Sequence, residues 1–104
     1  MKHTDKIAIL MAAYNGEAYI SSQINSILKQ SSDDWILYIH DDGSNDKTMD
    51  LIDTYSARYP DKIIKISGKP TGGPKENFLY LMENVDAPYL MFSDQDDLWL
   101  PDKV

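Results

Sequence analysis

Hydrophobic residues of this chain follow two patterns that alternate from one end to the other. Four short, mainly apolar runs, typical of buried strands, cover residues 7–13, 35–39, 62–66 and 89–92. Three segments between these runs carry apolar residues at helical spacing. Their repeating positions are Ile20, Ile24, Ile27 and Leu28, then Met49, Ile52, Tyr55 and Tyr59, then Phe78, Leu81, Met82 and Val85. The order β-α-β-α-β-α-β with short connections predicts an α/β protein, with a mostly parallel sheet and helices on both of its faces.

Turn and capping residues mark the ends of the expected helices. Asn15 is a suitable cap for the first helix, which should end near Gln30. Ser44 or Asn45 is expected to cap the second helix. Pro74 fits the first position of the third helix, where its missing N–H is not needed.

Composition and charge narrow the class of protein. The chain of 104 residues fits one small domain. Its net charge of −7 argues against nucleic acid as a partner, because phosphate contacts need a basic face. The absence of cysteine excludes disulfides, thiolate metal sites and a cysteine nucleophile. No apolar run is long enough to span a bilayer and no signal-peptide pattern opens the chain, so a cytoplasmic protein is expected.

Polar segments follow three of the expected strands, directly or after one residue, at residues 14–16, 41–44 and 94–97. In parallel sheets, ligands bind beyond the carboxyl ends of the strands, so these segments should converge on one site. Tyr14 could stack on a planar base there, or be an ordinary half-buried tyrosine. Asp42 could accept a hydrogen bond from a base or a ribose, or belong to a capped turn.

The segment 94–97 places three carboxylates within four positions, on Asp94, Asp96 and Asp97. Carboxylates this close repel one another unless a cation or hydrogen-bond donors hold them. Oxygen ligands of this kind suit a hard divalent ion, Mg²⁺ or Mn²⁺. The alternative is a solvated acidic turn.

The glycine loop 67–73 before the third helix is a weak indication of an anion site, and Lys75 could meet a phosphate there. It is not a Walker loop, because no Gly-Lys-Ser or Gly-Lys-Thr follows. The first strand also lacks the Gly-x-Gly-x-x-Gly of dinucleotide-binding folds.

Taken in order, these motifs resemble the inverting family 2 glycosyltransferases, which have the GT-A (Rossmann-like) fold. The similarity spans essentially the whole chain, and the Ser-Asp-Gln-Asp-Asp form looks most like bacterial rhamnosyltransferase-type members, which build surface polysaccharide. The matching stretches are Ala12-Ala13-Tyr14-Asn15-Gly16, Ile24-Asn25-Ser26-Ile27-Leu28-Lys29-Gln30, Asp41-Asp42-Gly43-Ser44-Asn45-Asp46 and Phe92-Ser93-Asp94-Gln95-Asp96-Asp97-Leu98-Trp99-Leu100-Pro101-Asp102-Lys103.

The resemblance implies a nucleotide-diphosphate-sugar donor, UDP-sugar or dTDP-sugar, and a divalent metal, Mg²⁺ or Mn²⁺. Asp94-Gln95-Asp96 matches the family's Asp-x-Asp motif. Asp96 would then bind the metal on the diphosphate, and Asp94 would contact the ribose or a metal-bound water. Asp97 would assist at the metal, and Gln95 would line the donor site.

The same resemblance assigns the nucleotide contacts outside that motif. Asp42 would accept the N3–H of uracil or thymine, and Tyr14 would stack on that base. Many family members have Thr or Pro where this chain has Ala12, so only the backbone can serve there. Lys75 is the candidate for a basic residue that members often place near the third helix.

In the family, the catalytic carboxylate base lies downstream of the Asp-x-Asp segment. Residues 1–104 are therefore expected to be the N-terminal, donor-binding part of a truncated GT-A domain, with no catalytic residue and no acceptor site. This part should bind donor but transfer sugar poorly or not at all. The acceptor would be a saccharide or a lipid-linked saccharide, and a peripheral position of the full-length protein at the inner face of the membrane stays open.

Other readings remain. A sugar nucleotidyltransferase of related fold needs a glycine- and basic-rich loop after the first strand, and Asn15-Gly16-Glu17 has no such charge. A haloacid-dehalogenase-type phosphatase carries Asp-x-Asp on its first strand rather than its fourth. A non-catalytic nucleotide-binding fragment is also possible, and an open sheet edge is expected to promote self-association.

Overall fold

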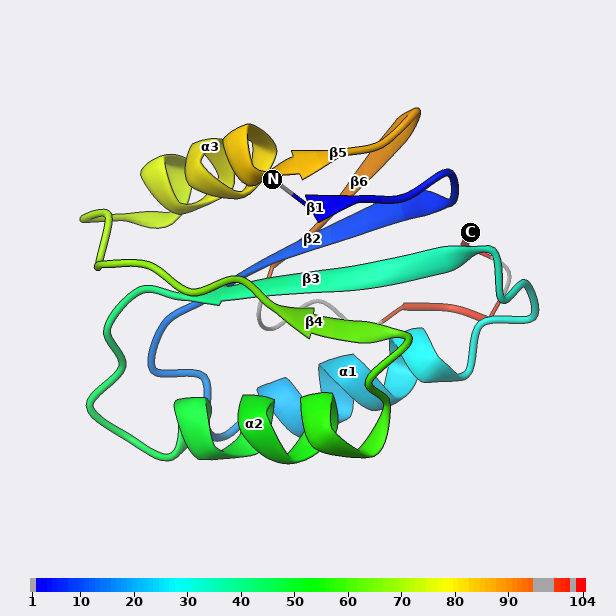
Figure 1. The fold of residues 1–104 in the computed structure, drawn as a ribbon. Coiled ribbons are helices and arrows are strands. Elements are labelled where there is room, and N and C mark those ends of the chain that lie inside the picture. Colours follow the sequence, from blue (N-terminus) through cyan, green and yellow to red (C-terminus); the bar gives the residue numbers. More distant parts are fainter. Residues whose placement is uncertain (1, 95–98, 102) are drawn as a thin grey trace.

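The computed structural model describes residues 2–94, 99–101 and 103–104 (Figure 1). Its main elements follow the expected β-α-β-α-β-α-β order, which is confirmed. They are β2 (Ile7–Ala13), α1 (Ile20–Leu28), β3 (Trp35–Asp41), α2 (Thr48–Arg58), β4 (Ile63–Lys65), α3 (Pro74–Asn84) and β6 (Tyr89–Asp94). Two short strands that the sequence did not predict, β1 (Lys2–His3) and β5 (Val85–Asp86), pair with each other in parallel.

The main sheet has the strand order β4-β3-β2-β6, and all three of its pairings are parallel. β2 lies between β3 and β6, and its residues from Ala8 to Ala13 are all buried. This position explains why its sequence is continuously apolar rather than alternating. At the carboxyl end of the sheet, Ala12 lies opposite both His40 and Asp94, and Ala13 lies opposite Asp41.

The helices cover both faces of the sheet, as expected: α1 and α2 lie on one side and α3 on the other (Figure 1). Residues of alternate parity on the strands therefore enter two separate cores. The larger core, under α1 and α2, includes Ile9, Met11, Ile24, Ile27, Leu37, Ile39, Ile52 and Trp99. The smaller core, under α3, includes Ala8, Leu10, Tyr38, Ile66, Leu81 and Val85.

The expected helix caps are wrong at two of the three helices. α1 begins at Ile20 and α2 at Thr48, and neither has a side-chain cap from Asn15, Ser44 or Asn45. These polar residues instead form hydrogen bonds between the loops that precede the helices. Pro74 does begin α3, as predicted.

The apolar face of α3 also differs from the expected one. Met82 is 42% exposed, whereas Asn77 is buried. Val85 lies just beyond the helix and pairs with Lys2. Helical spacing placed the stripe correctly around Leu81, but hydrophobicity alone could not show that a polar residue of α3 faces the sheet.

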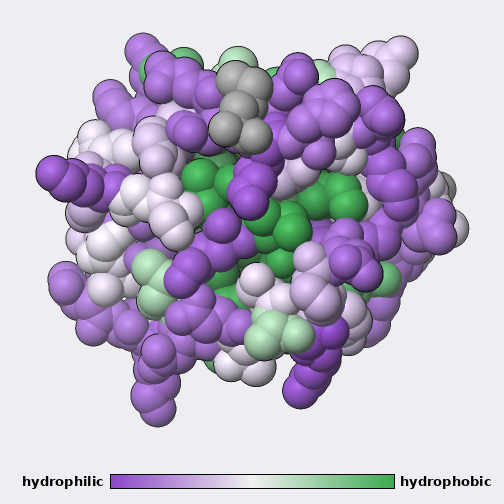
Figure 2. Space-filling view, viewed as in Figure 1, coloured by the Kyte–Doolittle hydropathy of each residue, from purple (hydrophilic) through white to green (hydrophobic). Residues whose placement is uncertain are grey.

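The side of the sheet carrying α3 is only partly covered. Figure 2 shows an apolar strip surrounded by polar side chains on this side, and the partly buried Ile36 and Ile64 belong to the same core. At one edge of the described sheet, β6 exposes Tyr89 and Phe92. Within the described residues, no helix combines the length and apolar character needed to cross a bilayer.

Candidate functional site

The carboxyl ends of β2, β3 and β6 lie side by side, because the three strands are parallel and in register there. The amide of Asp42 continues this register by donating to the carbonyl oxygen of Ala13 at 2.8 Å. The segments that follow these strands therefore leave the sheet at one edge. The predicted convergence of residues 14–16 and 41–44 with the end of β6 agrees with this register.

The first two of these segments are joined by hydrogen bonds. The residues involved are the same ones whose side chains suggested helix caps, together with an acid and a threonine. Asn15 N donates to Ser44 Oγ at 2.8 Å, Asn45 N to Asn15 Oδ1 at 2.8 Å, Gly16 N to Thr48 Oγ1 at 2.8 Å and Lys47 N to Glu17 Oε1 at 3.0 Å. Asn15 reaches this position with a φ of 48°, a conformation that asparagine tolerates. The edge of the site is thus held by polar side chains rather than by apolar packing.

Asp41 fixes the turn between β3 and α2. Its side chain is buried, and Oδ2 accepts hydrogen bonds from Ser44 N at 2.9 Å and Gly43 N at 3.2 Å. Ser44 Oγ donates to Asp41 Oδ1. Of the two adjacent aspartates, Asp41 is therefore structural, and this role is a common one for an aspartate at the start of a turn.

Asp42 points its carboxylate at the glycine loop before α3. Oδ1 accepts from the amide of Thr71 and from Thr71 Oγ1, the latter at 2.8 Å. Oδ2 accepts from Gly73 N at 3.0 Å. Burial raises the pKa of this carboxyl group, but the hydrogen bonds from residues 71–73 outweigh burial and leave the pKa below its ordinary value.

This arrangement changes the interpretation of the glycine loop. Gly73 directly precedes α3, so the Asp42 carboxylate lies at the positive end of that helix. The anion site that the sequence suggested at Gly72-Gly73 is thus occupied by the carboxylate of Asp42. Thr71, which sequence reasoning did not single out, supplies two of the three hydrogen bonds.

A buried polar pair lies next to this loop. Asn77 Oδ1 and His40 Nδ1 are 2.7 Å apart, and Asn77 Nδ2 donates to the His40 carbonyl oxygen at 3.1 Å. A carbonyl can only accept, so the amide orientation is fixed and His40 Nδ1 must carry the proton. The Tyr80 ring packs on the imidazole with centroids 4.7 Å apart. The sequence showed His40 at a strand end but gave no signal for its partner on α3.

The remaining nucleotide-site candidates are placed as follows. Tyr14 directly follows β2 and is 49% exposed, Ala12 is buried on β2, and Lys75 is exposed in the first turn of α3. Asp94 is the last residue of β6 and lies opposite Ala12. Their proposed contacts with a donor are not tested by this geometry and stay predictions.

Of the metal-ligand candidates, the structure places only the backbone of Asp94. Gln95, Asp96 and Asp97 lie outside the described residues, and nothing is described of the Asp94 side chain. Among the residues that are described, no group of three His, Asp or Glu could hold a metal ion. The ligand set 94–97 therefore stays a prediction.

The two flanks of the acidic segment are held by Gln23 and Ser26 on α1 and by Gln30, just beyond the end of that helix. Before it, Ser93 Oγ accepts from the buried Gln23 Nε2 at 2.6 Å. After it, Trp99 N donates to Ser26 Oγ at 3.0 Å. Gln30 Nε2 donates to the Leu100 carbonyl at 2.6 Å, and Val104 N donates to Gln30 Oε1 at 2.9 Å. The helical spacing of residues 23, 26 and 30 was visible in the sequence, but their function as anchors was not.

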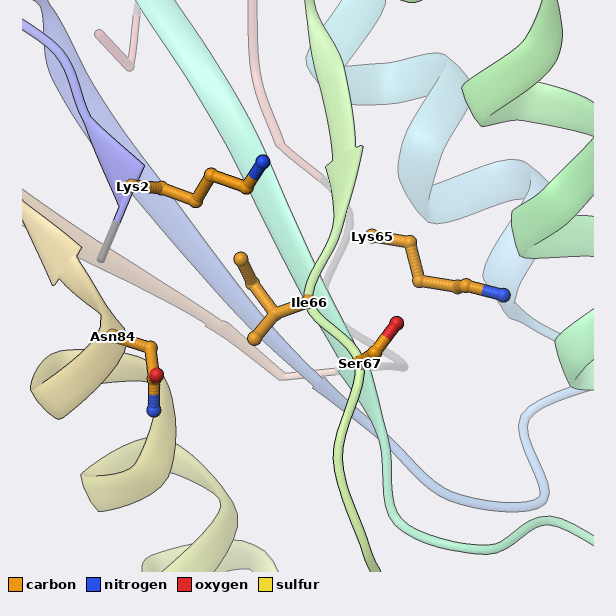
Figure 3. Close-up of a pocket in the computed structure, with 5 residues that line it drawn as sticks. All are labelled: Lys2, Lys65, Ile66, Ser67 and Asn84. Atoms are coloured by element: carbon orange, nitrogen blue, oxygen red, sulfur yellow. The ribbon is translucent and has the colours of Figure 1, made fainter.

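A separate hollow of about 390 Å³ lies on the α3 side of the sheet (Figure 3). It is lined by Lys2, Lys65, Ile66, Ser67 and Asn84, and includes none of the predicted site residues. The Lys65 side chain turns away from it, and its Nζ lies 2.7 Å from Asp53 Oδ1 on α2. This hollow is therefore distinct from the strand-end site.

The fold and the strand-end site define an α/β protein whose ligand site lies beyond the carboxyl edge of a parallel sheet. Residues 8–104 match the family model described as Glycosyl transferase family 2. The chain belongs to this family, as the sequence motifs predicted. The match favours a glycosyltransferase over the nucleotidyltransferase and phosphatase alternatives.

Similar proteins agree with this assignment. The chain is 41% identical over 99 residues to the dTDP-rhamnosyl transferase RfbG of Shigella flexneri, covering 90% of this chain and 34% of that protein. The structure of S. aureus TarS in complex with UDP aligns with a TM-score of 0.75 and 26% identity, over 93% of this chain and 29% of the other. A Pyrobaculum calidifontis mannosyltransferase, PcManGT, in complex with GDP-Man and Mn²⁺, aligns with a TM-score of 0.77 and 18% identity, over 90% of this chain and 28% of the other. These neighbours confirm the GT-A fold, and the chain spans only about a third of the length of such relatives.

Proposed function

We propose that residues 1–104 form the nucleotide-sugar-binding part of an inverting glycosyltransferase that acts in bacterial surface polysaccharide synthesis. The observation that carries this proposal is the position of Asp42 at the carboxyl edge of the sheet. Its amide donates to the carbonyl oxygen of Ala13, the residue before Tyr14, and hydrogen bonds from residues 71–73 keep the pKa of its carboxyl group below the ordinary value. Family membership supports it, as does the similarity to a dTDP-rhamnosyl transferase. The donor is a UDP-sugar or dTDP-sugar, since both bases present the same N3–H.

Each predicted residue has a role in this proposal. Asp42 accepts the N3–H of the base. Tyr14, which is half exposed where β2 ends at the same edge of the sheet, stacks on the ring. Ala12 contributes its backbone, and Lys75 lies in the first turn of α3, from which a lysine can approach a phosphate. Asp94 and Gln95 contact the sugar-nucleotide.

Asp96, with Asp94 and Asp97, is proposed to bind Mg²⁺ or Mn²⁺, because oxygen ligands in this number suit a hard cation. When bound, such a cation supplies Lewis-acid neutralisation of the diphosphate leaving group. The residues of this chain position the donor. The carboxylate that deprotonates the acceptor hydroxyl, and the site for a saccharide or lipid-linked saccharide acceptor, are assigned to the rest of a longer cytoplasmic protein.

Calorimetric titration of UDP and of dTDP, with Mn²⁺ and again with EDTA, tests this proposal. We expect metal-dependent binding that is lost in Asp96→Ala and weakened in Asp42→Asn. Asp61→Asn, an exposed aspartate beyond α2, is the matched control and should bind as the wild type does. Absence of nucleotide binding by the folded wild-type chain would contradict the proposal.

A further inference from the structure

The position of the Asp42 carboxylate is set by a loop that is itself anchored elsewhere. Gly73 O accepts a hydrogen bond from Asn77 N at 2.9 Å, and the Asn77 side chain is fixed to buried His40. At the other end of the loop, Ile66 N donates to the Ile39 carbonyl at 2.8 Å. The donors that meet Asp42 are therefore held by β3 and α3, independently of Asp42.

The loop also packs directly on the turn that carries Asp42. Gly43 has a φ of +89°, and a Cβ built on it would lie 2.9 Å from Pro70 Cγ. The absence of a side chain at Gly43 is thus what allows Pro70 to approach. This close packing is independent of the hydrogen bonds and fixes the loop beside the carboxylate.

Thr71 donates both of the hydrogen bonds that reach Oδ1 of the Asp42 carboxylate. Its amide and its hydroxyl both donate to Asp42 Oδ1, and each carboxylate oxygen has about two acceptor positions. Oδ2 accepts from Gly73 N at 3.0 Å. Among the described residues, these three hydrogen bonds fill three of about four acceptor positions, and Oδ2 accepts only one of the three. The Gly72 amide also faces the carboxylate and contributes more weakly to lowering its pKa.

We propose that Thr71 is a positioning residue that orients the Asp42 carboxylate so that Oδ2 presents its remaining acceptor position to an N–H group of the bound nucleobase. This inference rests on the proposed function and extends it to the selection of the base. A carboxylate that only accepts hydrogen bonds favours uracil and thymine, whose N3 carries a proton. It disfavours cytosine, whose N3 is itself an acceptor, because two acceptors would then face each other without a proton.

The test compares Thr71→Val, which removes the hydroxyl but keeps the β-branched shape, with Thr71→Ser, which keeps the hydroxyl. Thr54→Val is the matched control, because Thr54 is exposed on α2 and its hydroxyl donates to a backbone carbonyl. Affinities for UDP and CDP are measured with Mn²⁺ by calorimetry. The pKa of Asp42 is measured in the free proteins from the carboxyl ¹³C shift.

We expect Thr71→Val to weaken UDP binding about tenfold, as for loss of a hydrogen bond to a charged group, and to narrow the UDP-over-CDP preference. The pKa of Asp42 should rise in Thr71→Val, whereas Thr71→Ser and Thr54→Val should match the wild type in both measurements. A purely structural role for Thr71 would lower thermal stability without changing the affinity of the folded protein, and that result would overturn the inference.

Two other outcomes are decisive. Tighter UDP binding by Thr71→Val would overturn the inference, because it would mean that the loop competes with the base for Asp42. If wild-type protein binds UDP but the Val variant is unaffected, the inference fails and the proposed function stands. If the folded wild type binds neither UDP nor dTDP, the proposed function fails, and the inference fails with it.

Discussion

Asn77 holds His40 at two points, since its side-chain oxygen meets the imidazole and its side-chain nitrogen donates to the His40 backbone carbonyl. Both residues are buried, so neither group can turn to water instead. This pair fastens the first half of α3 to the end of β3, next to the loop that contacts Asp42. It therefore connects the small core to the strand-end site.

Asn77→Ala should destabilise the protein by about 2–4 kcal/mol, because a buried imidazole N–H would lose its partner and the His40 carbonyl would lose one of its hydrogen bonds. The free energy of unfolding is measured by urea denaturation. Asn84→Ala is the matched control on the same helix: its Nδ2 donates to the Tyr80 carbonyl, but Asn84 is only partly buried. Equal losses in the two variants would contradict the role assigned to Asn77.

Asp42 should make the stability of the protein depend on pH on the acid side. Its pKa in the folded protein lies below the ordinary value of 3.8, so its contribution is complete above that value and is lost as pH falls through the lowered folded pKa. Thermal unfolding of wild type and Asp42→Asn, followed downward from about pH 6, checks this. The wild type should be the more stable near neutral pH, and the difference should shrink below about pH 4. A constant difference over this range would mean that the carboxylate charge is not involved.

The order of elements could be predicted because it depends on local patterns. β2 and β3 are buried on both faces and read as continuous apolar runs, and Ile20, Ile24 and Ile27 recur at helical spacing and are all buried. Pro74 marked the start of α3 correctly because its ring restricts the backbone in the same way in every context.

The contacts that build the site could not be predicted in the same way. Asn15 and Ser44 are good caps in isolation, but the two loops lie together only after the sheet forms, and their polar groups then pair across 29 residues of sequence. The same holds for Asp42 with Thr71 and for His40 with Asn77. Strand-end position was enough to select Asp42, whereas its partners depend on tertiary structure that no local pattern records.

Gly43 and Gly72 are restricted by different features of the structure, and the same substitution at each position tests this. Both have a positive φ, +89° at Gly43 and +98° at Gly72, but a Cβ added to Gly43 would meet Pro70, whereas one added to Gly72 would meet no atom within 4 Å. Gly72→Ala should cost about 1 kcal/mol for the backbone conformation alone. Gly43→Ala should cost roughly 1–3 kcal/mol more, because the added methyl group also displaces Pro70. Urea denaturation measures both, and a smaller loss for Gly43→Ala than for Gly72→Ala would contradict the contact between the two loops.

The edge of the sheet at β6 is expected to make residues 1–104 self-associate at high concentration. In the described part of the chain, β6 pairs only with β2, and its exposed Tyr89 and Phe92 add apolar surface at this edge. Unpaired backbone groups beside apolar side chains favour strand addition, and a lysine on an edge strand opposes it. Sedimentation velocity over a range of loading concentrations should show association of the wild type and less of it for Tyr89→Lys. Leu79→Lys, at an exposed position on α3, is the control for added charge and should associate as the wild type does. A wild type that stays monomeric at the highest loading would show that the edge is protected, and equal effects of both lysines would show that net charge rather than the β6 edge controls association.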